Sequence, residues 1–314
     1  MKKFLIIANP VSGSFIGINK LEQLKTYFSN QGIYTEIYLT QYKNSAIDYC
    51  LKRHSEFTDF IAVGGDGAIN EICQIAKYRE INLGIIPAGT ANVLAKEFNI
   101  PENDIFKSAE IILKGYETKF DCWVANDKIF VLFVSGGIDS AAVENINPLL
   151  KKITGKTAYV YSFIKKFIFF NLPDYNITVS ISNDSFKNNQ HKKNNNQSET
   201  HIITKQFFLT NIEKYAGNFS LNCGKIYSDK IIELIYFKNI SRLKLLKFVF
   251  YMIFKKNILS LDYIGLIKSD EFKITGSNSF PVEFDGDSGL YIPLCITPNK
   301  YCINIKTGKK NIQP

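Results

Sequence analysis

The alternation of strand-like and helix-like segments over the first 120 residues most constrains the fold of this chain. The strand-like runs lie at 4–8, 35–40, 59–63 and 83–86. The helix-like segments follow them at 17–31, 44–54, 68–79 and 90–98. Strands and helices that alternate in this order favour a parallel sheet covered on both faces. We therefore predict an N-terminal doubly wound α/β domain.

The sequence changes character near residue 120. Short strand-like runs then dominate, separated by Asn, Gly and Asp turns, at 129–134, 175–182, 202–210, 231–237, 271–275 and 280–284. This pattern predicts a C-terminal antiparallel β-sandwich domain. We assign 1–120 to the α/β domain, with 293–314 as a segment that could complete it, and 121–292 to the β-rich domain. The asparagine-rich tract at 183–199 is interpreted as a long hairpin loop.

Composition narrows the function classes only partly. The 314 residues carry a formal net charge of +9, which favours polyanions or an anionic membrane surface as partners. The longest apolar run covers 248–254, whereas a membrane-spanning helix needs about 20 apolar residues. The six cysteines show no CxxC spacing and the three histidines do not cluster, so reduced thiols are expected and no zinc site. Acid–base chemistry would then fall to carboxylates.

The run FIAVGGDGAINEI at 60–72 predicts a buried strand that ends in glycines and feeds a helix. Glycines let a backbone approach a phosphate, and a helix N-terminus favours negative charge. Asp66 would repel a phosphate unless a divalent cation lay between them, and Mg²⁺ commonly bridges carboxylates and substrate phosphates. The alternative is a tight turn with an aspartate cap.

Two further loops repeat the pattern. LGIIPAGTANVLAKEF at 83–98 is again strand, glycine turn and helix, and ANPVSG at 8–13 also ends a strand. Thr90 could cap the helix or donate to a phosphate, and Asn92 could orient a nucleotide or hold the neighbouring loop. Loops at the carboxyl edge of one open sheet form a common ligand crevice. Neither a Rossmann nor a Walker motif is present.

Together these motifs resemble the diacylglycerol kinase catalytic domain family. The matching residues are Asn9-Pro10 with Ser12-Gly13, then GGDGAINE at 64–71 and PAGTANVLA at 87–95. VSGGIDSAAVE at 134–144, GKTAYV at 155–160 and VEFDGDSG at 282–289 extend the resemblance over nearly the whole chain. It implies ATP and Mg²⁺ as cofactors, bound in the cleft between the domains. The implied nucleotide-site residues are Asn9, Thr40, Gly64, Gly65, Asp66, Gly67, Asn70, Glu71, Gly89, Thr90 and Asn92, and Asp66 would contact the magnesium of Mg-ATP. For Glu71, stabilisation of a helix N-terminus is an equal alternative.

The family's general base belongs to an Asp-Gly-Glu motif, which reads Asp285-Gly286-Asp287 here. The resemblance implies that Asp287 accepts the proton of the lipid hydroxyl, or that Asp285 does; a plain β-turn is the alternative. Ala68 stands where the family usually has a hydroxyl residue, which costs the phosphate loop one hydrogen bond. A second metal site of some members would use Asp229, but Lys230 replaces the glycine beside it and brings a positive charge that disfavours a cation there.

The resemblance implies an ATP-dependent lipid kinase with diacylglycerol as the expected acceptor. The alternatives are an NAD kinase-like enzyme and a non-catalytic protein that binds nucleotide or lipid. We expect a cytoplasmic protein without a transmembrane segment or nucleic-acid partner, which associates transiently with the inner face of a membrane. The stretches at 161–170 and 241–257 mix lysines with apolar residues, and packing on the β domain is favoured over membrane contact for the second. The oligomeric state stays open, a homodimer included.

Overall fold

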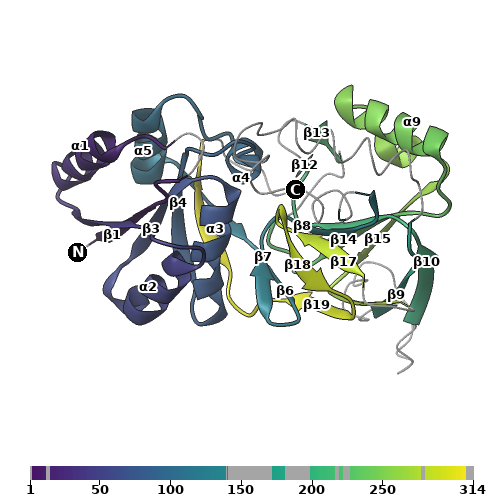
Figure 1. Ribbon diagram of the computed structural model, residues 1–314. Helices are drawn as coiled ribbons and strands as arrows, with labels where there is room; N and C mark the ends of the chain where they lie inside the picture. The colour runs from purple at the N-terminus through teal and green to yellow at the C-terminus, as the bar shows by residue number, and fades with distance from the viewer. Residues whose placement is uncertain are drawn as a thin grey trace, which may run out of the picture.

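The computed structural model describes residues 2–11, 15–138, 140, 172–180, 199–215, 219–221, 227–276 and 280–308 (Figure 1). The described strands form three six-stranded sheets and one short ribbon. Ser12, Gly13, residues 155–170, most of 139–144 and most of the asparagine-rich tract lie outside the described residues. Within the described part of the chain, no helix is long and apolar enough to cross a bilayer.

The first sheet is mostly parallel and contains the N-terminal strands. Its strands, in spatial order, are β2 (Tyr34–Leu39), β1 (Lys3–Ala8), β3 (Asp59–Gly64), β4 (Ile81–Pro87), β20 (Ile303–Thr307) and β5 (Tyr116–Phe120). Only β5 runs antiparallel to its neighbour, β20. Every residue from Phe4 to Ala8 is buried, which explains the continuous apolar run of β1 as a strand covered on both faces.

Helices cover both faces of this sheet, as expected. On one face, α1 (Ile18–Ser29) and α5 (Ile105–Lys114) pack on Phe4, Ile6 and Ile61. On the other face, Leu5, Ile7 and Ala62 contact α2 (Ser45–Arg53), α3 (Asp66–Cys73) and α4 (Val93–Glu97). The 3₁₀ turns η1 (His54–Glu56) and η2 (Gln74–Lys77) extend α2 and α3. Alternate residues of each strand thus serve two different cores.

Two antiparallel sheets share the second core. One contains β10 (Glu199–Thr204), β9 (Tyr175–Ser180), β16 (Glu271–Thr275), β19 (Leu294–Pro298), β6 (Trp123–Ala125) and β7 (Lys128–Phe130). The other contains β15 (Ile264–Ser269), β14 (Ile232–Phe237), β11 (Phe207–Thr210), β8 (Phe133–Gly136), β17 (Pro281–Phe284) and β18 (Asp287–Tyr291). Trp123, Phe207 and Phe272 lie in the shared core and are fully buried. The two sheets therefore form a sandwich.

The remaining elements lie against the second sheet of the sandwich. Helix α9 (Arg242–Ile253) packs on its outer face, where Phe248 contacts Phe208 and Phe237. The turn η4 (Ile258–Ser260) follows it, and β12 (Lys214–Tyr215) and β13 (Phe219–Ser220) form the short ribbon.

The structure differs from the predicted elements at three places. The predicted strands at 129–134 and 202–210 are each two strands, because the chain crosses from one sandwich sheet to the other within them. The predicted helix at 90–98 begins only at Val93, since Asn92 has a left-handed φ of 48°. Within the predicted completing segment 293–314, β19 pairs in the sandwich, and only β20 joins the first sheet.

Candidate active site

The loops predicted to hold a ligand follow neighbouring strands and lie at one edge of the first sheet. Backbone hydrogen bonds continue the ladder into them: the Thr40 amide donates to the Ala8 carbonyl at 2.9 Å, and the Ala88 amide donates to the Gly64 carbonyl at 2.9 Å. The amide of Asn9 donates to Val63 at 3.4 Å. The Asn9 side chain also accepts from the Val11 amide at 3.0 Å, which fixes the turn after β1.

The two glycine loops touch each other directly. A Cβ on Gly89 would lie 2.3 Å from the Cα of Gly65, and one on Gly64 would lie 2.9 Å from the Cβ of Ala68. Glycine is therefore required at position 89 by the approach of two backbones. Gly67, by contrast, is exposed and faces open space.

Asp66 joins these loops as a helix cap. Its Oδ2 accepts from the Val93 amide at 3.0 Å and its Oδ1 from the Leu94 amide at 3.1 Å. Burial raises the pKa of Asp66, and the two amides act against that rise. The carboxylate thus neutralises the N-terminus of α4, a role that matches the aspartate-cap alternative. Its contact with magnesium stays a prediction.

Asn92 holds the loop in which it lies. Its Oδ1 accepts from the Gly89 amide at 2.9 Å, and its Nδ2 donates to the Gly89 carbonyl at 3.1 Å and to Glu102 Oε1 at 2.8 Å. Asn92 is buried, so of its two predicted roles the structure supports the loop-holding one. Thr90, two residues earlier, is exposed.

Glu71 caps a different helix from its own. Its Oε1 accepts from the Asn44 amide at 3.0 Å and its Oε2 from the Ala46 amide at 3.3 Å, at the N-terminus of α2. Burial raises the pKa of Glu71, and these amides oppose the rise. The geometry corresponds to the predicted alternative of helix-terminus stabilisation.

The Asp285 carboxylate is enclosed by hydrogen-bond donors of the protein itself, unlike the accessible carboxylate expected of a general base. It is buried, has a left-handed φ of 47°, and its carboxylate accepts from the amides of Val131, Leu132 and Phe133 at 2.9, 2.9 and 3.1 Å. Asn70 Nδ2 donates to its Oδ2 at 2.7 Å. Burial raises the pKa of Asp285 to about 6, and these four donors oppose the rise. Because four donors occupy the carboxylate, Asp285 anchors the turn, and it ties the turn to α3 through Asn70.

Asp287, two residues later, presents its carboxylate to solvent. Its Oδ2 lies 3.0 Å from the Nζ of Lys43, and both side chains are exposed, at 53% and 72%. Lys43 belongs to the loop after β2, so the pair joins residues 244 positions apart in the chain. The late Asp-Gly-Asp motif and the carboxyl edge of the first sheet are therefore neighbours.

At the predicted second metal site, the residue after Asp229 is Lys230, and its ammonium group pairs with a buried carboxylate. Lys230 Nζ lies 2.9 Å from Asp121 Oδ1 and 3.0 Å from the Asn299 carbonyl. Asp229 is exposed and its Oδ1 accepts from the Ile231 amide at 3.0 Å. Among the described residues, no group of three or more His, Cys, Asp or Glu side chains could hold a metal ion. The role of Asp229 as a metal ligand stays a prediction.

Sequence reasoning missed two contributors to this region. Lys43 follows a predicted strand in a polar loop, but nothing in the sequence indicates its pairing with Asp287. Asp121 has a side chain only 2% exposed, and its contacts with Lys230 and Cys302 appear only in the folded chain. Charged partners so distant in sequence carry no local signal.

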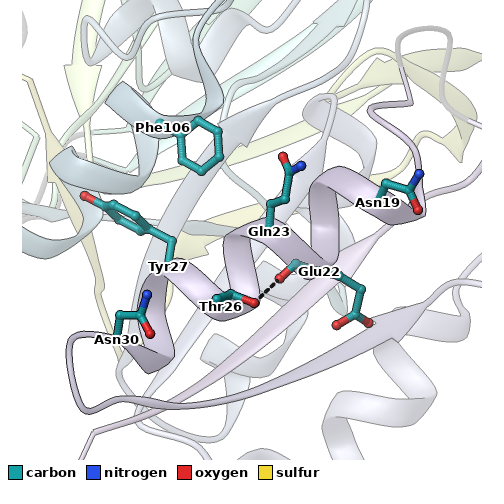
Figure 2. A pocket seen from close by; sticks show the side chains of 7 residues that line it. All are labelled: Asn19, Glu22, Gln23, Thr26, Tyr27, Asn30 and Phe106. Carbon is teal, nitrogen blue, oxygen red and sulfur yellow. Dashed lines mark hydrogen bonds between the residues drawn. The ribbon is translucent and has the colours of Figure 1, made fainter.

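A surface groove lies elsewhere, between α1 and α5. Figure 2 shows its lining residues, Asn19, Glu22, Gln23, Thr26, Tyr27, Asn30 and Phe106. Its volume is about 460 Å³, and Thr26 Oγ1 donates to the Glu22 carbonyl at 2.9 Å within it. None of the predicted site residues lines this groove.

Comparison with known proteins finds the same domain that the motifs indicate. Residues 3–125 match the model of the diacylglycerol kinase catalytic domain. A diacylglycerol kinase of Bacillus subtilis (strain 168) is 27% identical over 298 residues, which cover 93% of this chain and 92% of that protein. A diacylglycerol kinase of Staphylococcus aureus (strain JH9) is 31% identical over 169 residues, 53% of this chain and about half, 52%, of that protein.

The fold has solved counterparts as well. A diacylglycerol kinase crystal structure from Bacillus anthracis str. Sterne superposes with a TM-score of 0.71, at 20% identity, over 99% of this chain and 98% of that one. At this identity the likeness concerns the fold. The resemblance inferred from the motifs is confirmed: residues 3–125 of this chain match the diacylglycerol kinase catalytic domain, and the relatives named above are diacylglycerol kinases.

Proposed function

We propose that this chain is an ATP- and Mg²⁺-dependent lipid kinase that phosphorylates the hydroxyl group of diacylglycerol. The observation that carries the proposal is the position of Asp287. It lies beside Lys43 of the first sheet's ligand edge, while Asp285 fixes the same turn to α3. A carboxylate accessible to solvent thus stands next to loops that suit a phosphate chain.

The residues at the sheet edge fit a nucleotide phosphate. Helix α3 begins at Asp66 after Gly65, and no side chain caps its N-terminus. The first-turn amides of a helix lack partners within the helix and favour an anion. Gly67 is open to solvent, and the exposed Thr90 belongs to the loop that touches Gly65. Gly65, Gly67 and Thr90, with Asn9 and Thr40 on the neighbouring loops, would hold the nucleotide, and Asp66 its magnesium. When bound, Mg-ATP supplies the phosphoryl group and neutralises its charge.

Asp287 would accept the proton of the lipid hydroxyl on a carboxylate oxygen. A carboxylate in this role needs to lie within hydrogen-bond reach of the hydroxyl, and the exposure of Asp287 permits that approach. Lys43 holds the carboxylate at one oxygen and leaves the other accessible. Asp285 and Asn70 position the turn that carries Asp287.

The proposal is tested with γ-labelled ATP, Mg²⁺ and mixed micelles that contain a panel of lipid alcohols, with NAD in a separate reaction. We expect label on diacylglycerol, and a loss of about 100-fold or more in Asp287→Ala, the usual size of a general-base contribution. Asp262→Asn removes an exposed carboxylate from the turn before β15 and is the control, with unchanged activity.

Other outcomes overturn the proposal in distinct ways. Label on NAD would indicate an NAD kinase-like enzyme. Bound ATP without label on any lipid would indicate a non-catalytic nucleotide-binding protein. Label on a lipid with full activity in Asp287→Ala would retain the kinase but remove Asp287 as its base.

A further inference from the structure

Helix α9 has two apolar faces, and only one of them is packed. Leu245, Phe248 and Met252 are buried against the sandwich. On the opposite side, four side chains of the helix and the residue after it are exposed: Leu243 at 78%, Leu246 at 51%, Phe250 at 44%, Ile253 at 49% and Phe254 at 59%. Steps of three and four residues place these side chains in one row along the helix. We call this row the outer face of α9.

Such a row is unusual on the solvent side of a surface helix. A helix that packs on one side usually carries polar residues on the other. Single exposed apolar residues are common, but a contiguous group of large ones marks a binding surface. The expectation that 241–257 packs on the β domain is therefore met by one face only, and the other face needs an occupant.

The charges around the row indicate which occupant. Positions 242–256 contain one arginine, four lysines and no acidic residue. Within the described part of the chain, Lys244, Lys247, Lys255 and Lys256 form no ion pair with a carboxylate. Lys256 Nζ lies instead 5.1 Å from the ring centre of Phe250, and Lys247 Nζ lies 5.9 Å from that of Tyr251. A surface that combines aromatic and aliphatic side chains with uncompensated lysines complements anionic lipid headgroups.

Helix α9 is fixed to the sandwich by an N-terminal cap and by aromatic packing, so its outer face has a defined position. Ser241 Oγ accepts from the Lys244 amide at 3.3 Å and caps the N-terminus. Phe248 stacks on Phe208 at 5.9 Å between ring centres and meets Phe237 edge-on at 5.0 Å. In Figure 1, α9 lies at the upper right end of the molecule, away from α1. With 12 residues it is too short to span a bilayer, so it would lie in the interface plane.

We propose that the outer face of α9 docks on a bilayer that contains anionic lipid. The apolar row enters the headgroup region, and the lysines contact lipid phosphates. The inference rests on the proposed function in one respect, since a lipid kinase must reach an acceptor held in a membrane. Its test does not depend on catalysis.

The full-length protein is floated with vesicles of phosphatidylcholine alone, and of phosphatidylcholine mixed with phosphatidylglycerol, without nucleotide. We expect binding to the mixed vesicles. Leu246→Asn/Phe250→Asn should weaken it at least about tenfold, because two apolar anchors are lost. Lys247→Glu/Lys255→Glu should weaken it at least about fivefold for each lysine removed, and added salt should weaken wild-type binding. Both pairs are exposed, and circular dichroism with thermal unfolding checks that each variant is folded.

The matched control is Tyr78→Asn/Phe106→Asn, which removes two exposed aromatic side chains from the other part of the molecule. It should bind the vesicles as the wild type does. Unchanged vesicle binding of the α9 variants, or no binding by the wild type, overturns the proposal. A wild-type dimer in sedimentation that the α9 variants convert to monomer, with vesicle binding unaltered, would assign the face to a second copy of this chain instead.

Parallel assays keep this proposal separate from the kinase proposal. If the α9 variants lose vesicle binding but retain phosphorylation of a short-chain, dispersed acceptor, both proposals stand. If the wild type binds vesicles and phosphorylates no lipid, the docking surface stands and the kinase proposal fails.

Discussion

Replacement of Asp285 by asparagine should destabilise the fold. The two oxygens of Asp285 divide the four donors equally: Oδ1 accepts from Leu132 and Phe133, and Oδ2 accepts from Val131 and Asn70. An asparagine has a single acceptor oxygen, so in either orientation two of the four donors face an NH₂ group. Asn70 cannot turn its amide to compensate without losing its bond to the Ile129 carbonyl.

The magnitude follows from the bonds that are lost. A hydrogen bond to a charged group contributes about 1.5–3 kcal/mol, and a neutral amide recovers part of that because no charge is buried. Two lost bonds cost about 3–6 kcal/mol, and the neutral variant is relieved of the cost of burying the charge, about 3 kcal/mol for a carboxyl whose pKa is raised to about 6. We expect a net loss of about 1–3 kcal/mol at pH 7.5. A chain of this length unfolds with an entropy of about 0.66 kcal/mol/K, so the melting temperature should fall by about 2–4 °C.

Trp123 provides the assay. It is the only tryptophan, and it is fully buried in the sandwich core, so its fluorescence follows unfolding by heat or urea. The control is Asp287→Asn, two residues away, whose exposed ion pair with Lys43 contributes at most about 1 kcal/mol. If Asp285→Asn melts within about 1 °C of the wild type, or if both variants lose equal stability, the anchoring role of Asp285 is refuted.

Three further predictions concern the same region. Burial raises the pKa of Asp285 to about 6, so the folded chain holds this proton more tightly than the unfolded chain. In urea titrations Asp285 should therefore lower wild-type stability by up to about 3 kcal/mol as pH rises from about 4 to about 6. The slope should be smaller in Asp285→Asn, where Asp66 and Glu71 still have raised pKa values. Gly89→Ala places a Cβ 2.3 Å from the Gly65 Cα and should cost about 2–3 kcal/mol in thermal unfolding and weaken ATP binding in calorimetry. Lys230→Met leaves the buried Asp121 side chain, 2% exposed, without its cation. The free energy of unfolding in urea should fall by about 2–3 kcal/mol, which is less than for a fully buried pair because the lysine is 38% exposed.

Matched variants separate these mechanisms from general damage. Gly67→Ala adds a Cβ that meets nothing within 4 Å at a helical position, so its stability should equal that of the wild type or exceed it by up to about 1 kcal/mol. Lys238→Met removes an exposed lysine whose Nζ donates to the Asp262 carbonyl at 3.2 Å and forms no ion pair within the described residues, so it should cost at most about 0.5 kcal/mol. Equal losses in the test and control variants would contradict the close approach at Gly89 or the ion pair at Lys230. For Asp285, equal pH slopes of the wild type and Asp285→Asn between pH 4 and pH 6 would contradict the raised pKa.

Local sequence patterns determined much of the first sheet. The continuous apolar run at 4–8 predicts a strand buried on both faces, and the structure has that strand with a helix layer on each side. The glycines at 64, 65 and 89 predict that the backbone closely approaches a phosphate. In the structure Gly65 and Gly89 closely approach each other. These features follow from the chain's own periodicity and from glycine's missing side chain, both of which act within a few residues.

Only the tertiary structure shows which carboxylates bind backbone amides and which one faces solvent. The sequence treats Asp66, Glu71, Asp285 and Asp287 alike, as acidic residues in polar motifs. In the fold, three of them receive backbone amides from segments distant in the sequence, and only Asp287 faces solvent. The same holds for β20, which enters the first sheet from the far end of the chain. The packing of remote segments decides which carboxylate lies against which unpaired backbone amide. A local sequence pattern contains no information about that packing.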